Sequence, residues 1–384
     1  MMWERVKLAD VSDSCLGKML DQRKNKGIYK PYLANVNVRW GAFDLDNLQE
    51  MKFEDDEDER YGIKYGDLII CEGGEPGRCA IWKEQLPNMK IQKALHRLRV
   101  NEEMDYRYVY YWFLLAGKQG ALKQYYTGAT IMHMPGQKLK EVVIDKPPLD
   151  VQRKIGDYLE AFDDLIENNQ KQIKLLEEAA QRLYKEWFVD LRFPGYEDVE
   201  IVDGVPEGWE ITPINMVANL KAGGDKPKTF SEKMTNENKI PVFANGITGK
   251  GLMGFTDKAV INNPSVTISA RGTVGVVFLR TEPYVPIVRL ISVTPIEDKV
   301  DILYLYLYLI NQNFRSTGAA QQQITVPLLK SKNIICPTDD VRKSFNDVII
   351  SIFNKIDILE KHINKLTEAR DRLLPKLMNG EIEV

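Results

Sequence analysis

The chain has 384 residues, of which 44% are hydrophobic and 28% are charged, with a formal net charge of −3. That length accommodates two or three domains with complete cores, and the composition is typical of a globular protein. No apolar run reaches the length of a transmembrane helix, about twenty residues, the N-terminal residues lack the apolar stretch of a signal peptide, and the four cysteines lie far apart. We therefore expect a cytoplasmic protein without a membrane segment, disulfide framework, metal site or cofactor.

The first part of the chain, residues 1–146, predicts a mixed, strand-rich domain. β-Branched and aromatic residues mark its elements, and glycines mark its turns. In chain order these are a buried strand at 67–71, a glycine-rich turn at 72–78, a second strand at 79–82, an aromatic helix at 106–115 and a loop with His133 at 128–140. The six consecutive acidic residues at 54–59 are expected to form a solvated loop.

Residues 147–191 predict one long helix. Pro147 and Pro148 exclude helix before it, Asp150 is placed to cap its first turn, and residues 193–195 end it. At 1.5 Å per residue, forty residues make a rod of about 60 Å, which disfavours the alternative of a core helix in one α/β domain. Apolar residues recur every three or four positions along it and form a heptad seam, with Asn169 at one seam position. Such a seam needs a partner helix. The seam residues are Phe162, Ile166, Asn169, Ile173, Leu176 and Leu183.

A second copy of this segment lies 190 residues further along the chain. Val151 corresponds to Val341, and the same offset still holds where Arg182 corresponds to Arg372. A constant offset over about sixty residues indicates a duplication. Residues 337–384 therefore predict a second long helix, which supplies the partner of the first. Its seam residues are Ile352, Ile356, Leu359, Ile363, Leu366 and Leu373.

The segment between the helices has two parts. Residues 192–208 are rich in proline and glycine and predict a linker. Residues 209–336 repeat the plan of the first domain, because residues 241–245 match 31–35 and residues 266–275 match the strand and glycine turn, at offsets that drift between 196 and 210. The expected fold class is α+β, with two similar strand-rich domains alternating with two long helices.

The charge is unevenly distributed. Residues 1–146 carry +1, or +7 without the acidic run, residues 149–208 carry −8, residues 209–335 carry +5 and residues 336–384 carry −1. The globular parts are thus basic and suited to an anionic ligand, although plain solvation explains so modest a surplus equally well.

Motifs for catalysis are missing. The Asn/Asp-Pro-Pro-Tyr/Phe tetrapeptide of amino-methyltransferases does not occur, and residues 262–265 are the nearest approach to it. The glycines of residues 245–251 lack the spacing of a phosphate-binding loop and predict a turn. Three histidines without a neighbouring Ser/Asp pair or metal-ligand spacing argue against hydrolysis.

Two segments resemble the specificity subunits of type I restriction–modification systems. They are Pro147-Pro148-Leu149 with residues 152–155, which open the first helix, and residues 373–382 near the end of the second, and the double plan covers essentially the whole chain. The resemblance implies that residues 1–146 and 209–336 are target-recognition domains, each reading half of a split sequence in double-stranded DNA. It implies that the helices pack as an antiparallel coiled coil, which separates the readers and docks two methyltransferase (M) subunits, with restriction (R) subunits joining them. Such a subunit catalyses nothing itself.

A paired helix of this length fits a spacer. From Phe162 to Trp187 the seam spans about 37 Å at 1.5 Å per residue, close to the separation of half-sites one DNA turn apart. Asn169 is polar where its repeat position, Leu359, is apolar. A single buried Asn fixes the register of a coiled coil, so we expect Asn169 to help hold the spacer length, unless it faces a partner or water.

The candidate DNA-binding residues lie in polar loops after the strands. Arginine can bond guanine and glutamine can bond adenine with two hydrogen bonds each, whereas lysine suits phosphates. The alternative for each is an ordinary surface residue. The candidates for base contacts are Arg39, Arg78, Thr127, Thr130, Arg271, Thr273, Gln321, Gln322 and Gln323, and those for phosphate contacts are Lys24, Lys26, Lys226, Lys228 and Lys250.

Two functions from other classes compete with DNA reading. A coiled-coil scaffold without DNA binding predicts globules without a basic surplus. A self-contained methyltransferase or nuclease predicts the motifs that are missing. We expect a DNA-binding specificity subunit.

Overall fold

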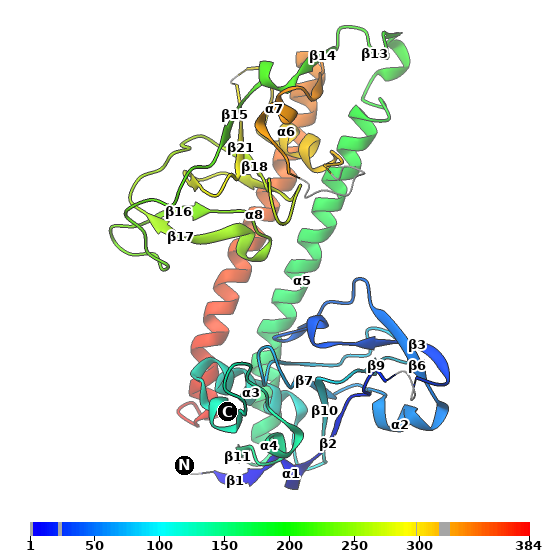
Figure 1. Cartoon of the computed structure of the whole chain (residues 1–384), viewed down its shortest axis with the longest axis vertical. Helices are drawn as coiled ribbons and strands as arrows, with labels where there is room; N and C mark the ends of the chain where they lie inside the picture. Colours follow the sequence, from blue (N-terminus) through cyan, green and yellow to red (C-terminus); the bar gives the residue numbers. More distant parts are fainter. Residues whose placement is uncertain (1–2, 22–24, 297, 315–322) are drawn as a thin grey trace. The chain divides into compact units, whose positions relative to one another are not determined.

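A computed structural model describes residues 3–21, 25–296, 298–314 and 323–384. The chain divides into two compact units: unit 1 contains Met1–Asn169 and Lys361–Val384, and unit 2 contains Gln170–Glu360. Each unit holds one strand-rich globule with part of each long helix, α5 (Leu149–Phe188) and α8 (Asp339–Met378), drawn in green and in orange to red in Figure 1.

Unit 1 is built on a four-stranded sheet in the order β2-β10-β7-β8 and a three-stranded sheet in the order β6-β3-β9. Helix α3 is capped at its N-terminus by Asp105, whose carboxylate accepts from the N–H groups of Arg107 and Tyr108, and at its C-terminus by the left-handed Gly120. The elements of unit 1 before α5 are β1 Glu4–Lys7, α1 Leu8–Val11, β2 Ser12–Leu16, β3 Ile28–Leu33, β4 Val38–Arg39, β5 Ala42–Phe43, β6 Gln49–Phe53, α2 Asp58–Tyr61, β7 Leu68–Cys71, β8 Cys79–Ile81, β9 Lys90–Ile91, β10 Leu95–Val100, α3 Tyr106–Gln119, α4 Gly136–Lys140 and β11 Val143–Lys146.

Strand β7 is apolar throughout because both of its faces are buried. Leu68 and Ile70 belong to the core that α3 covers, whereas Ile69 and Cys71 point into a second core around Trp82. Alternate residues of a strand point to opposite faces, so a strand between two cores carries a continuous apolar run. The predicted strand at 67–71 is confirmed.

Unit 2 repeats this plan with a four-stranded sheet in the order β15-β21-β18-β19 and a three-stranded sheet in the order β17-β16-β20. Between α5 and α8 its elements are β12 Ile201–Val202, β13 Val205–Pro206, β14 Glu210–Pro213, β15 Ala218–Ala222, β16 Ile240–Phe243, β17 Leu252–Thr256, β18 Ser265–Ile268, β19 Val277–Arg280, β20 Val285–Pro286, β21 Ile291–Pro295, α6 Ile302–Ile310, α7 Val326–Lys330 and β22 Asn333–Cys336.

The two globules agree in detail as well as in plan. β1 pairs antiparallel with β11 in unit 1, and β14 pairs in the same way with β22 in unit 2. Tyr108 of α3 donates a hydrogen bond to the carbonyl of Asp145 at 2.9 Å, and Tyr304 of α6 donates to the carbonyl of Ile335. These bonds support the offset of 196 between α3 and α6 and of 190 beyond them. The duplication seen in the sequence is therefore a duplication of structure.

The long helices pair antiparallel within each unit. In unit 1, Leu159 of α5 and Leu374 of α8 lie in one core. In unit 2, the rings of Phe188 of α5 and Phe345 of α8 are 4.8 Å apart. Later residues of α5 thus meet earlier residues of α8. Of the predicted seam, Ile356 and Leu359 are buried and the others are half-buried, and the expected α+β fold class is confirmed.

Several local features differ from prediction. Helix α5 begins at Leu149, so Asp150 lies within its first turn and not at the N-cap. The loop at 128–140 contains the one-turn helix α4, which is too short to show periodicity. The linker 192–208 contains the hairpin of β12 and β13, whose connection, Asp203 and Gly204, has positive φ angles of 52° and 85°. Asp-Gly is the sequence that such a two-residue turn favours.

Candidate nucleic-acid interface

Three loops of unit 1 come together, and we call them the unit 1 loop cluster: residues 34–37, 72–78 and 127–133. Nδ2 of Asn35 donates a hydrogen bond to the carbonyl of Gly73 at 2.7 Å, and Gly73 forms an isolated antiparallel bridge with His133. A Cβ atom at Gly73 would lie 2.8 Å from Nδ1 of His133, so a larger residue there would displace the His133 ring. Segments far apart in sequence are thus held at one place.

The third of these loops is a short hairpin. Thr127 and His133 exchange two backbone hydrogen bonds of 2.8 and 2.9 Å, and Gly128 has a φ of 100°. The tip of the hairpin, which includes Thr130, is exposed. A rigid base with an exposed tip is suited to reaching a ligand outside the domain.

Unit 2 has a corresponding set, the unit 2 loop cluster, comprising residues 244–251, 269–276 and 287–289. Oδ1 of Asn245 accepts a hydrogen bond from the N–H of Ala270 at 2.8 Å, and Nδ2 donates to the carbonyl of Val288 at 2.6 Å. Asn245 follows β16 as Asn35 follows β3. Asn245 bonds to the turn after the buried strand β18, and Asn35 bonds to the turn after the buried strand β7. The two asparagines thus tie separate loops together.

A buried arginine supports the unit 2 loop cluster. The guanidinium of Arg280 lies 3.7 Å from the ring centre of Phe243 and donates to the carbonyl of Lys250 at 2.6 Å and to the hydroxyl of Thr267 at 3.1 Å. Its acceptors are neutral, and burial lowers the pKa of Arg280 to about 10. Arg280 thus fixes the backbone at Gly249 and Lys250, which have positive φ angles. Sequence analysis did not single it out, because its acceptors come from other strands and loops.

The three candidate arginines stand in different surroundings. Arg271 is exposed and makes no hydrogen bond or ion pair with another residue that the structure describes. Arg39 is exposed, but it donates to the carbonyl of Val38 at 3.0 Å and pairs with Asp44 at 3.4 Å. The guanidinium of Arg78 is largely buried and donates to Oδ1 of Asn35 at 2.9 Å. Arg271 is therefore the most available for a base, and Arg78 holds the loop cluster together.

The candidate threonines and glutamines also differ in exposure and hydrogen bonding. Thr130 and Gln323 are exposed, and the hydroxyl of Thr127 lies 3.4 Å from the carbonyl of His133. The hydroxyl of Thr273 is buried and has no hydrogen-bond partner in the described part of the chain. Gln321, Gln322 and the candidate Lys24 lie outside the described residues.

Of the candidate lysines, Lys26 and Lys228 are exposed. The ammonium of Lys226 lies 3.4 Å from the ring centre of Phe230, a cation–π contact. Lys250 pairs with Glu360 of α8 at 2.8 Å, which attaches the unit 2 loop cluster to the helix. A phosphate contact by Lys250 would compete with this pair.

The acidic run is solvated only in part: residues 54–56 and Glu59 are exposed, but Glu57 and Asp58 are half-buried. Glu57 pairs with Lys18, and Asp58 pairs with Lys30 at 2.7 Å and with Lys90 at 3.1 Å. Lys18 and Lys90 are only 3% and 4% exposed, and a buried ammonium group needs a counter-charge.

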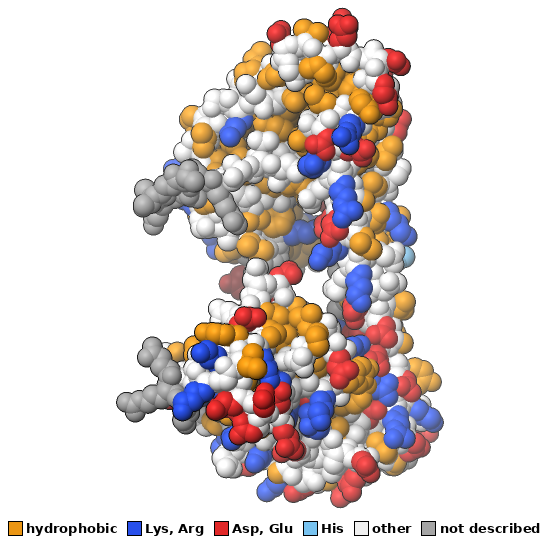
Figure 2. Space-filling view, turned by 90° about the vertical axis from the view of Figure 1, so that its right-hand side faces the viewer, with side chains coloured by type: hydrophobic (Ala, Val, Ile, Leu, Met, Phe, Trp, Pro, Cys, Tyr) orange, Lys and Arg blue, Asp and Glu red, His pale blue; other side chains and the backbone are white. Residues whose placement is uncertain are grey.

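Setting this run aside to obtain +7 for residues 1–146 is therefore unjustified, because two of its acids neutralise buried lysines. On the face of the molecule in Figure 2, basic and acidic side chains are mixed. Net charge is thus weaker support for DNA binding than the loop clusters.

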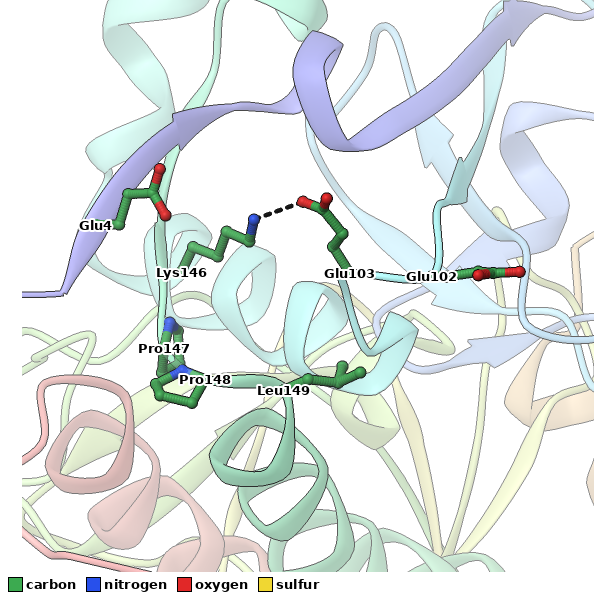
Figure 3. Close-up of a pocket in the computed structure, with 7 residues that line it drawn as sticks. All are labelled: Glu4, Glu102, Glu103, Lys146, Pro147, Pro148 and Leu149. Carbon is green, nitrogen blue, oxygen red and sulfur yellow. Dashed lines mark hydrogen bonds and ion pairs between the residues drawn. The ribbon is translucent and has the colours of Figure 1, made fainter.

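A surface depression of about 470 Å³ lies in unit 1 where β11 leads into α5. In Figure 3, Lys146 points toward Glu103. The two side chains pair at 2.5 Å, and Pro147 and Pro148 line the same depression. The hydrogen bond that Lys146 donates to the Glu103 carboxylate raises the pKa of Lys146. The depression is lined by Glu4, Glu102, Glu103, Lys146, Pro147, Pro148 and Leu149, and none of these residues belongs to the loop clusters.

The described residues contain neither a metal-binding cluster nor a membrane-spanning helix. No group of three or more His, Cys, Asp and Glu side chains there is placed to hold a metal ion. No helix within the described ranges is both long and apolar enough to cross a membrane.

The fold is a duplication: two copies of one strand-rich domain, each with a loop cluster, joined by paired helices. Comparison with known proteins agrees. The family model described as "Type I restriction modification DNA specificity domain" matches residues 2–178 and 206–368. The chain therefore belongs to the family of type I restriction–modification DNA specificity subunits, which recognise DNA.

Individual relatives support this assignment. The chain is 29% identical over 344 residues to the type I restriction enzyme MjaIX specificity subunit of Methanocaldococcus jannaschii, covering 83% of this chain and 78% of that protein. It is 26% identical over 315 residues to the HindI specificity subunit of Haemophilus influenzae, covering 62% and 68%. The fold is similar to the crystal structure of the S subunit from M. genitalium, with a TM-score of 0.58 at 18% identity, covering 98% of this chain and 96% of that chain.

Proposed function

We propose that the chain reads a bipartite target in double-stranded DNA, with the unit 1 loop cluster reading one half and the unit 2 loop cluster the other. One observation carries this proposal: the same asparagine-held arrangement occurs twice, and its turns differ. Gly73, Gly74 and Glu75 in unit 1 correspond to Arg271, Gly272 and Thr273 in unit 2. A retained scaffold with different side chains is what two readers of different sequences require.

In each unit, base and phosphate contacts are assigned to different residues. Arg271 is exposed, unpaired among the described residues and long enough to reach a base edge in the major groove. Thr130 at the hairpin tip is the corresponding candidate of unit 1. The proposed phosphate contacts are made by Lys26, Lys226 and Lys228. Contacts to phosphates position a protein on DNA but carry no information about the base sequence. Arg39, Thr127, Thr273 and Gln323 remain candidates, and Lys24, Gln321 and Gln322 lie outside the described residues.

The helices are proposed to set the gap and to dock the catalytic partners. Both α5 and α8 carry exposed apolar side chains outside their seam, and exposed apolar surface commonly marks a protein interface. They include Tyr158 and Leu165 in unit 1 and Leu175, Val348 and Ile358 in unit 2. Two M subunits would bind there and R subunits would join them. The methyl transfer would take place in the M subunits, because reading the neighbouring bases does not require the reader to hold the flipped adenine.

The test is site selection by the chain purified with its methyltransferase partner. Duplexes with two randomised half-sites and a randomised gap should yield two short specified segments at one preferred gap, and affinity should fall as salt rises. A single uninterrupted motif would contradict two separate readers. Affinity that does not depend on salt would contradict DNA binding altogether. Methyl transfer by the isolated chain would contradict the assignment of catalysis to the partner.

A further inference from the structure

The two long helices keep one antiparallel register. In unit 1, Asp163 of α5 forms an ion pair with Arg370 of α8, and in unit 2, Phe188 of α5 packs against Phe345 of α8. From Asp163 to Phe188 the chain advances 25 positions, and from Arg370 to Phe345 it goes back 25. The offset of 190 makes Phe353 the repeat counterpart of Asp163 and Ala180 the counterpart of Arg370.

At this point of unit 1 the helices and α3 share a polar network. Asp163 accepts a hydrogen bond from the hydroxyl of Tyr111 at 2.8 Å and pairs with Arg370. Arg370 also bonds to Asp371 at 2.9 Å, and Asp371 pairs with Lys118 of α3 at 2.5 Å. The side chain of Arg370 is 14% exposed and that of Asp163 is 25% exposed. Both charges are therefore largely removed from water.

The counterpart positions in unit 2 form an uncharged, mainly apolar cluster. Ala180 and Leu307 are buried, Phe353 and Phe314 pack against the same core, and the ring of Phe353 lies 5.8 Å from that of Tyr306. The full correspondence, by the offsets of 190 and 196, is Asp163 with Phe353, Arg370 with Ala180, Asp371 with Gln181, Tyr111 with Leu307 and Lys118 with Phe314. The same place in the duplicated fold is thus ionic in one half and uncharged in the other.

This difference has consequences for pairing between like helices. Because α5 and α8 are repeats, α5 could pair with α5 of a second chain, and α8 with α8, in the same register. An α5–α5 pair would set Asp163 against Ala180, and an α8–α8 pair would set Arg370 against Phe353. The α5–α5 pair would bury the Asp163 carboxylate without a cationic partner, which is strongly unfavourable, and the α8–α8 pair would leave Arg370 only with Asp371 of its own helix. Only the α5–α8 pair brings the two charges together.

We propose that the Asp163–Arg370 network selects the partner of each long helix: α5 accepts α8 and rejects α5 of a second copy of this chain. The seam alone cannot make that choice, because its apolar residues recur in both helices. Polar groups inside a helix pair commonly act in this way, excluding alternative pairings at some cost in stability.

The test transfers the residues of unit 2 into unit 1 in the full chain. The triple variant Tyr111→Leu, Asp163→Phe, Arg370→Ala gives these three positions the residues of unit 2, so that pairing between like helices no longer buries an unpaired Asp163. The matched control, Asp163→Arg with Arg370→Asp, reverses the ion pair and keeps the preference for α5–α8. Each protein is refolded from urea over a range of concentrations, and its mass is measured by light scattering.

A cross-link reports α5–α5 pairing directly. In such a pair of the same register, Gln172 would lie beside Lys171 of the second chain, so Gln172→Cys is added to every protein and treated with a bismaleimide. Samples without that substitution control for the natural cysteines. Wild type and the reversed pair should stay at 44.1 kDa without the α5–α5 cross-link, and the triple variant should give at least tenfold more cross-linked dimer.

A triple variant that folds and stays monomeric without the cross-link would overturn the proposal. If the triple variant does not fold, the single reversals Asp163→Arg and Arg370→Asp decide the question. Each should reduce the monomer fraction, which the double reversal should restore. Equal monomer fractions in all three would also overturn the proposal.

Discussion

Nδ2 of Asn35 donates a hydrogen bond to the carbonyl oxygen of Gly73 across 2.7 Å and 38 positions of sequence. The bond joins the segment after β3 to the glycine turn after β7. Gly73 of that turn also forms an antiparallel bridge with His133. In unit 2, Asn245 holds the turn through the N–H of Ala270 instead. One residue type at one place in the fold thus keeps each loop cluster assembled, by a different hydrogen bond in each copy.

Replacing either asparagine should therefore impair one reader only. Asn35→Ala removes one of the two hydrogen bonds to the Gly73 carbonyl, which keeps the N–H of Glu75, and removes the Oδ1 acceptor of Arg78, so it should lower stability by about 1–2 kcal/mol. It should weaken discrimination in one half-site, and Asn245→Ala should do so in the other. The measurement is site selection with each variant, alongside its melting temperature. Equal loss in both half-sites would show that the asparagines act on global stability and not on separate readers.

Arg271 is the sharpest test of base reading. If its guanidinium bonds a guanine, Arg271→Ala should cost about 1–3 kcal/mol of binding and relax specificity at one position of one half-site. Arg78→Ala serves as the contrast, because Arg78 bonds Asn35 and should lower stability as well as binding. Uniform weakening of Arg271→Ala across all DNA sequences would reassign Arg271 to a phosphate.

The repeat and the helix seam could be predicted because they are periodic. A constant offset and an apolar residue every three or four positions are properties of the sequence itself, and they led to α5, α8 and the double plan. The buried strand β7 was predictable for a similar reason, since a run of β-branched residues reports burial on both faces. The Asp203-Gly204 hairpin also had a local signal, which the glycine and proline content of the linker obscured.

What the sequence did not indicate depends on distant partners. The acidic run resembles a solvated loop until Lys18, Lys30 and Lys90 are brought to it from three other strands or loops. Arg78 resembles a free loop arginine, but its acceptor Asn35 lies 43 positions away. The distance between two loop residues along the sequence does not show whether they are bonded. The list of candidate DNA-binding residues could therefore be shortened only with the structure.

The acidic run should leave a signature in the pH dependence of stability. Burial raises the pKa of Asp58, the hydrogen bonds from Lys30 and Lys90 lower it, and the net pKa lies below the ordinary 3.8. Ionised Asp58 thus contributes stability that is complete above about pH 4 and is lost as the pH falls through the lowered pKa. Because the carboxylate is partly exposed, we expect no more than about 1 kcal/mol.

Urea unfolding of Asp58→Asn against wild type measures this contribution. The difference in free energy of unfolding should be present at pH 7 and shrink below pH 3.8. Asp55→Asn is the control, since Asp55 is almost fully exposed and should change little at either pH. A difference that persists unchanged at low pH would contradict the ionic role of Asp58.

The duplication predicts that the globules are exchangeable. A chimera joined within residues 147–153, with the second globule of a related chain, should bind a hybrid site composed of one half from each parent. The junction lies at the start of α5, where the offset of 190 is constant and the register of the helices is preserved. Site selection gives the result directly. Chimeras that fold, by circular dichroism and melting, but recognise neither parental half would contradict the modular proposal.

The helices are predicted to set the gap between the half-sites. Inserting four residues after Asn169 in α5, with four at the facing position of α8 to keep the register, adds about 6 Å of helix. At 3.4 Å per base pair along each strand, the preferred gap should lengthen by between one and two base pairs. Asn169→Leu is the milder probe: Asn169 is half-buried, and replacing it with the residue found at Leu359 should raise the melting temperature and broaden the range of accepted gaps. Sites selected from a library of randomised gaps measure both effects, and an unchanged gap after the insertion would show that α5 and α8 do not determine it.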